Sequence, residues 1–310
     1  MSHHAATTVL KAAADPSRLR LLALLAAGEA TVKELVDIIG QSQPRVSRHL
    51  KILADARIVT HFRDGQWMYY RLEPSGAAAE LVDCAVALAR SGDETLSADR
   101  ERLAEVRAAR ERYALTAPSG PKRWVGSIGD RPSEAALEQA LLAALGGGEL
   151  GDLLDIGVGS GAVLRLLAPR CRTAVGLDVS RGMRVLARSR LQGAGLGRCT
   201  IRAGDMHELP FPELSFDLVV VDEVLSLATD PQPVLAEATR VLRPTGRLLV
   251  LDRIEPAALR LTSQSGKRAL YENQLAVMLR AVGLRASAPS WFPGRRLDLA
   301  WVTASARSVR

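Results

Sequence analysis

The sequence predicts an α/β protein in two parts: an N-terminal winged helix-turn-helix of mixed α+β type, then a doubly wound, mostly parallel sheet. Capped short helices followed by a hairpin signature predict the first part. Apolar strand-like runs that alternate repeatedly with helical patterns after residue 150 predict the second. A chain of 310 residues has room for about two domains of roughly 150 residues. We expect domains at residues 1–95 and 126–310, joined by a helical connector at residues 96–125.

The first helices are marked by their capping residues. Asp15 precedes Pro16, which suits the first position of a helix. Thr31 and Glu34 have capping-box spacing, and the helix that they begin is expected to end at Gly40. Ser42 is expected to cap the next helix. Two short helices joined by a tight glycine turn make a helix-turn-helix.

A hairpin follows the two helices. Residues 58–62 and 67–72 alternate in polarity, and residues 63–66 between them contain Asp64-Gly65, a frequent two-residue hairpin turn. Helices followed by such a hairpin indicate a winged helix-turn-helix.

The second helix of the pair carries a basic face. No acidic residue occurs between positions 41 and 51, and the basic residues lie across the helix from its apolar stripe. Such a face on this helix suits the major groove of duplex DNA, although a merely solvated face is the alternative. The expected DNA contacts are Gln43, Ser47 and Arg48 to base edges, Arg45 and Lys51 to phosphates, and Arg63 of the hairpin to the backbone or minor groove.

Residues 7–90 resemble the ArsR/SmtB family of dimeric bacterial repressors through segments 15–22, 42–53 and 69–72. The resemblance implies a homodimer that is held by its first and last helices and binds a palindromic operator. Many members bind thiophilic metals through a Cys-x-Cys, but here Thr31 and Lys33 occupy those places. Residues 75–91, where the second metal site of the family lies, contain Cys84 and no histidine. We therefore expect no metal site.

The bulk composition points to a protein of the reducing cytoplasm. The three cysteines, Cys84, Cys171 and Cys199, are scattered and odd in number, which indicates neither a disulfide framework nor a clustered zinc site. No apolar run approaches the ~18 residues of a membrane span, and no secretory signal opens the chain. The net charge of +7 is compatible with an acidic partner such as DNA. Residues 97–113 predict an exposed connector or dimer-contact helix.

A glycine-rich turn organises the second domain. An apolar strand ending near Asp155 is followed by Gly157, Gly159 and Gly161, where the backbone turns sharply and admits a ligand. The spacing formally meets a dinucleotide fingerprint, so a nicotinamide cofactor has to be considered. However, the charge of Asp155 would oppose a pyrophosphate.

Two further acids favour a different cofactor. Asp178 ends the next strand, where it can accept hydrogen bonds from ribose hydroxyls, and Asp205 can accept one from an adenine amino group. Together with Asp155 they suit S-adenosylmethionine, whose sulfonium is positive. The alternative is that these acids only cap helices.

Residues 126–304 resemble the class I S-adenosylmethionine-dependent methyltransferases, which have a Rossmann-like fold. Segments 155–161, 176–180, 204–206, 216–220 and 241–248 stand in the order and spacing of the family. The resemblance implies S-adenosylmethionine or S-adenosylhomocysteine as cofactor. The implied contacts are Asp155, Gly157, Gly159 and Gly161 around the methionine moiety, Asp178 at the ribose, Asp205 and Met206 at the adenine, with Met183 nearby and Asp222 on the methyl-transfer face.

Two functions remain open on these residues. The chain is either a transcriptional regulator whose methyltransferase domain senses the cofactor, or an active methyltransferase whose winged helix docks it on DNA or regulates its own gene. Asp222 and Glu223 are the candidate bases for methyl transfer to an unidentified acceptor. The absence of the family's metal ligands favours the regulator, because a repressor still needs a signal.

Overall fold

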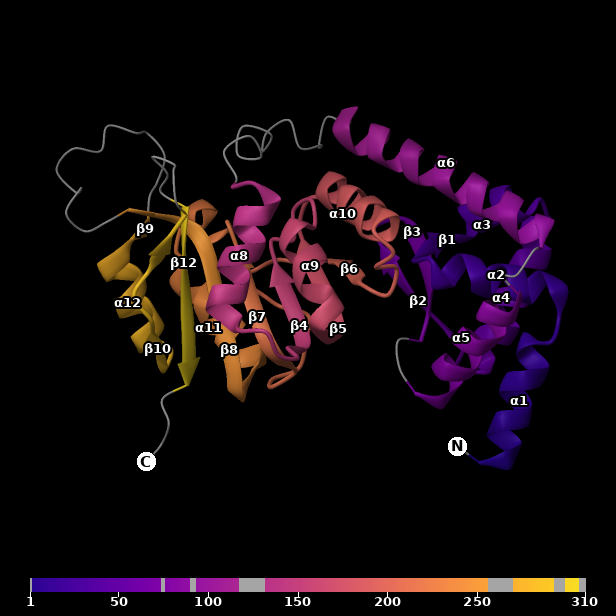
Figure 1. The fold of residues 1–310 in the computed structure, drawn as a ribbon, viewed down its shortest axis with the longest axis horizontal. Helices are drawn as coiled ribbons and strands as arrows, with labels where there is room; N and C mark the ends of the chain where they lie inside the picture. Colours follow the sequence, from indigo (N-terminus) through magenta and orange to yellow (C-terminus); the bar gives the residue numbers. More distant parts are fainter. Residues whose placement is uncertain are drawn as a thin grey trace. The chain divides into compact units, whose positions relative to one another are not determined.

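The computed structural model describes residues 2–73, 76–89, 93–116, 132–255, 270–292 and 299–306 (Figure 1). Contacts divide the chain into two units: unit 1 is Met1–Ala117 with Arg188–Thr200, and unit 2 is Pro118–Ala187 with Ile201–Arg310. Within the described residues, no helix combines the length and apolarity needed to span a membrane. The predicted boundary at 95/96 falls inside a helix of unit 1, and the one at 125/126 lies outside the described residues. Both boundaries stay predictions.

Unit 1 contains the predicted helix-turn-helix. Asp15 accepts a hydrogen bond from the Arg18 amide, and Thr31 forms the predicted capping box with Glu34. Ser42 occupies its predicted cap position, but its side chain makes no cap hydrogen bond, because Pro44 removes one of the amide donors it would accept from. The helices are α1 (His3–Ala13), α2 (Pro16–Ala26), α3 (Val32–Ile39), α4 (Gln43–Asp55), α5 (Ala77–Ala89) and α6 (Glu94–Thr116).

The wing is a small antiparallel sheet of order β1-β3-β2, made of β1 (Ala30–Thr31), β2 (Val59–Asp64) and β3 (Trp67–Leu72). The hairpin is confirmed, but its turn is shorter than predicted. Asp64 belongs to β2 and is 3% exposed, so the turn consists of Gly65 and Gln66. A buried carboxylate needs a nearby cation to offset the loss of its hydration. Arg188 supplies that cation for Asp64.

Helix α6 is less exposed than its sequence indicated. Asp99 and Arg110 are 1% and 8% exposed, and each forms an ion pair with an earlier helix. Arg20 Nε donates to Asp99 at 2.6 Å, and Arg110 Nε donates to Glu34 at 2.7 Å. The apolar stripe in this segment predicted a contact face, which did not include Asp99 or Arg110. These two charged side chains are buried because each pairs with an opposite charge on another helix.

Unit 2 is built on a mixed sheet of order β10-β12-β8-β7-β4-β5-β6, which confirms the doubly wound, mostly parallel prediction (Figure 1). Strand β4 pairs in parallel with β5 and β7, and β8 pairs in parallel with β7, while β12 is antiparallel to β8 and β10. The strands are β4 (Gly151–Ile156), β5 (Cys171–Asp178), β6 (Thr200–Ala203), β7 (Phe216–Asp222), β8 (Leu242–Glu255), β9 (Leu270–Tyr271), β10 (Leu284–Ala286), β11 (Ser290–Trp291) and β12 (Leu299–Ala306).

Helices and short turns connect these strands. They are α8 (Glu134–Leu145), α9 (Ala162–Leu167), α10 (Arg181–Gly193), α11 (Gln232–Val241), α12 (Glu272–Ala281) and the 3₁₀ turns η2 (Ala168–Arg170) and η3 (Leu225–Leu227). Ile156 pairs with Leu177 on one side and Val221 on the other, so β4, β5 and β7 end level with one another. We call this end of the sheet the cofactor edge, because ligands of such sheets bind beyond the carboxyl ends of parallel strands.

Candidate functional site

The glycine turn lies at the cofactor edge, directly after β4. Gly157, Gly159 and Gly161 all have positive φ, at +83°, +51° and +83°. A Cβ on Gly157 would lie 2.8 Å from the backbone oxygen of Asp222, so no side chain fits there. A Cβ on Gly159 would meet only the Gly157 oxygen, at 3.6 Å. The turn is therefore closed toward the sheet and open above Gly159, as a cofactor cradle requires.

Asp178 joins the end of β5 to this turn. One carboxylate oxygen accepts from the Gly159 amide at 3.0 Å and the other from the Ser180 amide at 2.7 Å. Burial raises the pKa of Asp178, although both hydrogen bonds act to lower it. Each oxygen keeps a lone pair for a ribose hydroxyl. Asp178 therefore lies beside the glycine turn, and its assignment to the ribose stays a prediction.

Asp155 and Asp222 lie deeper at the same edge. Asp155 sits within β4 and is 0% exposed, and Asp222 ends β7 at 2% exposure. Glu223 follows in the left-handed region at φ +52°, with its amide bonded to Leu251 O at 2.7 Å. Its carboxylate lies 3.9 Å from the Arg253 guanidinium. A non-glycine residue held in this conformation is typical of functional sites.

The adenine assignment has a looser geometry. The Asp205 side chain is 63% exposed and bonds to His207, with its oxygen 2.8 Å from His207 Nδ1. The backbone and side-chain hydrogen bonds of His207 lower the pKa of Asp205. Met206 packs against the sheet core, and Met183 is 6% exposed in α10. In this structure Asp205 therefore turns toward His207, whereas Asp178 turns toward the glycine turn.

Sequence reasoning did not assign Asp252 to the site, although this acid lies within β8, the strand after β7 in the sheet. Its side chain is 0% exposed and accepts amide hydrogen bonds from Leu225 at 2.8 Å and Arg253 at 2.7 Å. Burial raises the pKa of Asp252 to about 6. An acid at the end of a strand was visible in the sequence, but its burial was not.

Taken together, the edge fits S-adenosylmethionine. Buried carboxylates suit a cofactor that carries positive charge, Asp178 suits its ribose, and the space above Gly159 admits its methionine moiety. When bound, this cofactor supplies an electrophilic methyl group. The residues that would hold it are Asp155, Gly157, Gly159, Gly161, Asp178 and, at the adenine, Asp205 and Met206.

The candidate nucleic-acid interface is on α4 in unit 1. All six predicted contact residues are exposed: Gln43, Arg45, Ser47, Arg48, Lys51 and Arg63. The opposite face of α4 is buried through Val46, Leu50 and Leu53, each at 0% exposure. The basic face is therefore held outward by a rigid core contact. Lys51 forms a surface pair with Asp55 at 3.2 Å, and both side chains are more than half exposed.

Unit 1 also contains the C-terminal half of α10, which the sequence predicted as part of the second domain. Arg188 of this segment has a side chain that is 1% exposed and contacts two carboxylates. Its Nε donates to Glu29 at 2.9 Å, and its Nη1 lies 2.7 Å from Asp64 at the end of the wing strand. The guanidinium also lies 4.2 Å from the ring centre of Tyr69. Burial acts to lower the pKa of Arg188, but these groups raise it overall.

Gln192 extends this cluster. Its amide donates to the Glu29 backbone oxygen at 2.9 Å and accepts from Arg110 at 3.0 Å. No local pattern identifies Arg188 or Gln192, because their partners lie far away in the sequence. We call Arg188, Glu29, Asp64 and Gln192 the α10 anchor.

Among the described residues, no three His, Cys, Asp or Glu side chains gather as a metal site. Cys84 is exposed, Cys171 is half-buried and Cys199 is buried. Burial raises the pKa of the Cys171 thiol to about 12.

The chain is similar to two groups of known proteins. Residues 15–61 match the bacterial regulatory protein, arsR family, and residues 154–250 match the methyltransferase domain family. The arsenic resistance transcriptional regulator ArsR1 of Pseudomonas putida is 42% identical over 100 residues, which cover 32% of this chain and 77% of that protein. The nocamycin O-methyltransferase of Saccharothrix syringae is 38% identical over 112 residues, which cover 35% of this chain.

The chain spans 40% of the length of that O-methyltransferase. Among solved structures, the [4+2]-cyclase SpnF aligns at a TM-score of 0.50 and 19% identity, over 64% of this chain and 95% of that one. This likeness concerns the fold alone. The methyltransferase domain implies S-adenosylmethionine or S-adenosylhomocysteine as its cofactor.

Proposed function

Because the chain belongs to the arsR family of bacterial regulatory proteins and carries a methyltransferase domain, we propose that it is a DNA-binding regulator of transcription that senses S-adenosylmethionine or S-adenosylhomocysteine. As a homodimer it binds a palindromic operator through α4 and the wing. It works in the cytoplasm, where the DNA is. The cofactor edge acts as a receptor, and its occupancy changes the affinity for the operator.

The observation that carries this proposal is the course of α10. The helix begins three residues after Asp178, whose carboxylate holds the glycine turn, and its other half carries the α10 anchor. We infer that a ligand at Asp178 acts on unit 1 through this continuous stretch of chain, because residues Arg188–Thr200 belong to unit 1. Arg188 contacts Asp64, which lies at the tip of the DNA-binding wing. A coupling of about 1–3 kcal/mol is typical of such linked sites.

The exposed face of α4 supports the DNA side of the proposal. Arg45, Arg48 and Lys51 are available to a duplex while Val46 and Leu50 are locked in the core. Operator specificity then depends on Gln43, Ser47 and Arg48, and phosphate contacts depend on Arg45, Lys51 and Arg63.

Active methyl transfer is the alternative, with Asp222 and Glu223 as bases. Asp222 is buried, at 2% exposure, and the Glu223 side chain is 14% exposed. A general base has to lie within hydrogen-bond reach of the acceptor. Their low exposure supports the receptor as the first proposal, with methyl transfer kept as the alternative.

The test is a titration of DNA binding with each ligand. The DNA upstream of the coding sequence serves as probe, and its affinity for the full-length protein is measured with no ligand, with S-adenosylmethionine and with S-adenosylhomocysteine. We expect at least one ligand to change the affinity by about 5–150-fold. Asp178→Ala should abolish this response and leave ligand-free DNA binding intact.

Arg48→Ala is the complementary variant. It should weaken DNA binding by about 1–3 kcal/mol and leave cofactor binding, measured by calorimetry, unchanged. If calorimetry detects cofactor binding but neither ligand shifts the DNA affinity, the sensor proposal is wrong and the methyltransferase alternative stands.

A further inference from the structure

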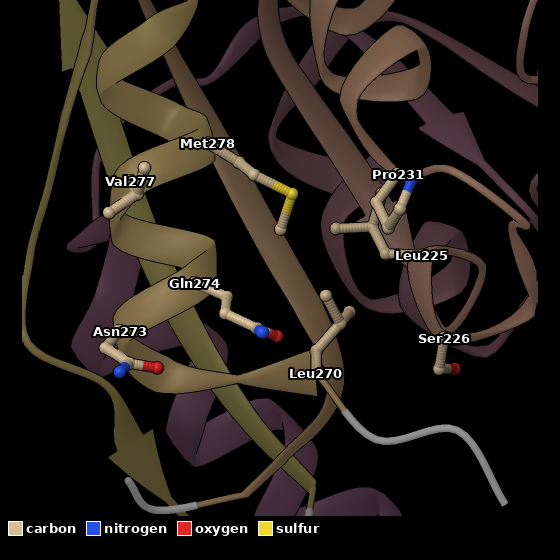
Figure 2. Close-up of a pocket in the computed structure, with 8 residues that line it drawn as sticks. All are labelled: Leu225, Ser226, Pro231, Leu270, Asn273, Gln274, Val277 and Met278. Atoms are coloured by element: carbon tan, nitrogen blue, oxygen red, sulfur yellow. The ribbon is translucent and has the colours of Figure 1, made fainter.

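A cavity of about 460 Å³ lies in unit 2 between η3 and α12. Pockets of about 300–1,000 Å³ are typical of small-molecule sites. Figure 2 shows Gln274 and Met278 extending from α12 toward Leu270 and Leu225 on the other side of the space. Leu225 and Leu270 are 1% and 5% exposed and belong to the sheet core, so one wall of the cavity is rigid.

The lining defines the chemistry of its ligand. All eight lining residues are uncharged. Leu225, Leu270 and Met278 offer apolar surface, and the side chains of Gln274, Asn273 and Ser226 offer hydrogen-bond donors and acceptors. A charged ligand would leave water here without a counter-charge among the lining side chains, which is costly. An uncharged, mainly apolar molecule with a carbonyl or hydroxyl group meets both kinds of surface.

The cavity is mechanically continuous with the cofactor edge. Leu225 and Ser226 follow Val224, which packs directly over Gly157 of the glycine turn. Asp252 fixes this wall, because one of its oxygens accepts the amides of Leu225 at 2.8 Å and Ser226 at 3.3 Å. The Asp252 carboxylate behind the wall would also repel an anion.

We propose that this cavity binds an uncharged, mainly apolar small molecule beside the cofactor, with Gln274 as its hydrogen-bonding partner. The site is distinct from the residues assigned to the cofactor. It stands whether the domain acts as a sensor or as an enzyme.

The test uses two fluorescent probes with the same aromatic skeleton. N-phenyl-1-naphthylamine is uncharged, and 1-anilinonaphthalene-8-sulfonate adds one negative charge. With the full-length protein, the uncharged probe should bind at least about tenfold more tightly, because the sulfonate has no counter-charge in the lining. Equal binding of both probes would overturn the proposal.

Two variants of Gln274, an exposed residue of α12, test where the probe binds, and Arg280→Trp is their control. Gln274→Trp fills the space and should weaken binding of the uncharged probe by about tenfold or more, whereas Arg280→Trp on the same helix, outside the cavity, should change it by less than about twofold. Gln274→Lys places a cation in the lining and should tighten binding of the sulfonate probe. Thermal unfolding midpoints confirm that all three variants fold.

If Gln274→Trp and Arg280→Trp bind the uncharged probe alike, the probe sits elsewhere and the proposal fails. The result is independent of the operator titration: a DNA response without probe binding refutes the cavity ligand alone, and probe binding without a DNA response refutes the sensor alone.

Discussion

The two units hold their buried acids in different ways. In unit 1, Glu29 and Asp64 contact Arg188, and Glu34 contacts Arg110. In unit 2, two buried acids, Asp178 and Asp252, accept hydrogen bonds from backbone amides. Asp178 binds the amides of Gly159 and Ser180, and Asp252 binds those of Leu225, Ser226 and Arg253.

The pKa values follow this difference at Glu34 but not at Glu29, whose pKa burial raises although Arg188 acts to lower it. Burial acts to raise the pKa of Glu34, but the charge and hydrogen bonds of Arg110 lower it overall. Burial raises the pKa of Asp178, and it raises that of Asp252 to about 6, because amide dipoles compensate a carboxylate less than a guanidinium does. Acids neutralised by arginine serve the structure. At Asp178 and Asp252 the amides only partly offset the cost of burying the charge, so both pKa values stay raised.

The largest expected effect is the removal of the buried cation. Arg188→Met leaves Glu29 and Asp64 buried without it and should lower the free energy of unfolding by about 3–5 kcal/mol. Arg190→Met is the matched control on the same helix, because Arg190 and Glu111 are both more than 40% exposed. It should cost less than about 1 kcal/mol. Urea unfolding followed by circular dichroism measures both losses. Equal losses would show that the α10 anchor stabilises the fold no more than an exposed ion pair does.

The next effect is a pH dependence that is opposite for two acids of unit 2. The folded pKa of Asp252, about 6, lies above that of an unfolded chain. The contribution of Asp252 to the free energy of unfolding is therefore fully present below the unfolded pKa and is lost as pH rises through 6. The total loss is about 3 kcal/mol. The difference in unfolding free energy between wild type and Asp252→Asn should grow as pH falls from 7 to 4.

Asp152 provides the contrast. Its hydrogen bonds with Arg172, Thr173 and Arg243 lower its pKa to about 2, so its contribution is present above the unfolded pKa and is lost as pH falls toward 2. The difference between wild type and Asp152→Asn should shrink as pH falls from 4 to 2. Denaturation series across both pH ranges give the two slopes, and slopes of the same sign would contradict the comparison.

A smaller effect is expected for cofactor affinity. Asp178→Asn removes a charged acceptor that holds the glycine turn and should weaken binding by about 1.5–3 kcal/mol. Asp205→Asn changes an exposed side chain and should weaken it by less than about 1 kcal/mol. Calorimetry with S-adenosylhomocysteine measures both, and equal losses would mean that the adenine end matters as much as the ribose end.

The smallest effect on stability is expected on the proposed DNA-binding face of α4. Lys51→Ala removes a pair between side chains that are 75% and 65% exposed, so the free energy of unfolding should change by less than about 0.5 kcal/mol. The slope of log affinity for DNA against log salt should nevertheless fall by about 1, because one phosphate contact is lost. An unchanged slope would remove Lys51 from the interface.

Local signals in the sequence determined most of the secondary structure and part of the site. The capping box at Thr31 forms as expected, and the helix that it begins ends at Gly40 as predicted. Helix caps, glycine turns and strand ends depend on a few neighbouring residues, so the sequence predicts them without knowledge of the fold. For the same reason Asp178 could be assigned to the cofactor site from its place at the end of a strand.

Only the tertiary structure decided which charges are buried and where a cavity forms. Arg188 meets a glutamate that is 159 positions away in the sequence, and Arg20 meets Asp99 from another helix. The pKa of Asp252 depends on the elements that cover it, and the space between η3 and α12 depends on how two distant segments pack. A charge is stable inside a protein only beside its partner, and the identity of that partner is a property of the packed chain.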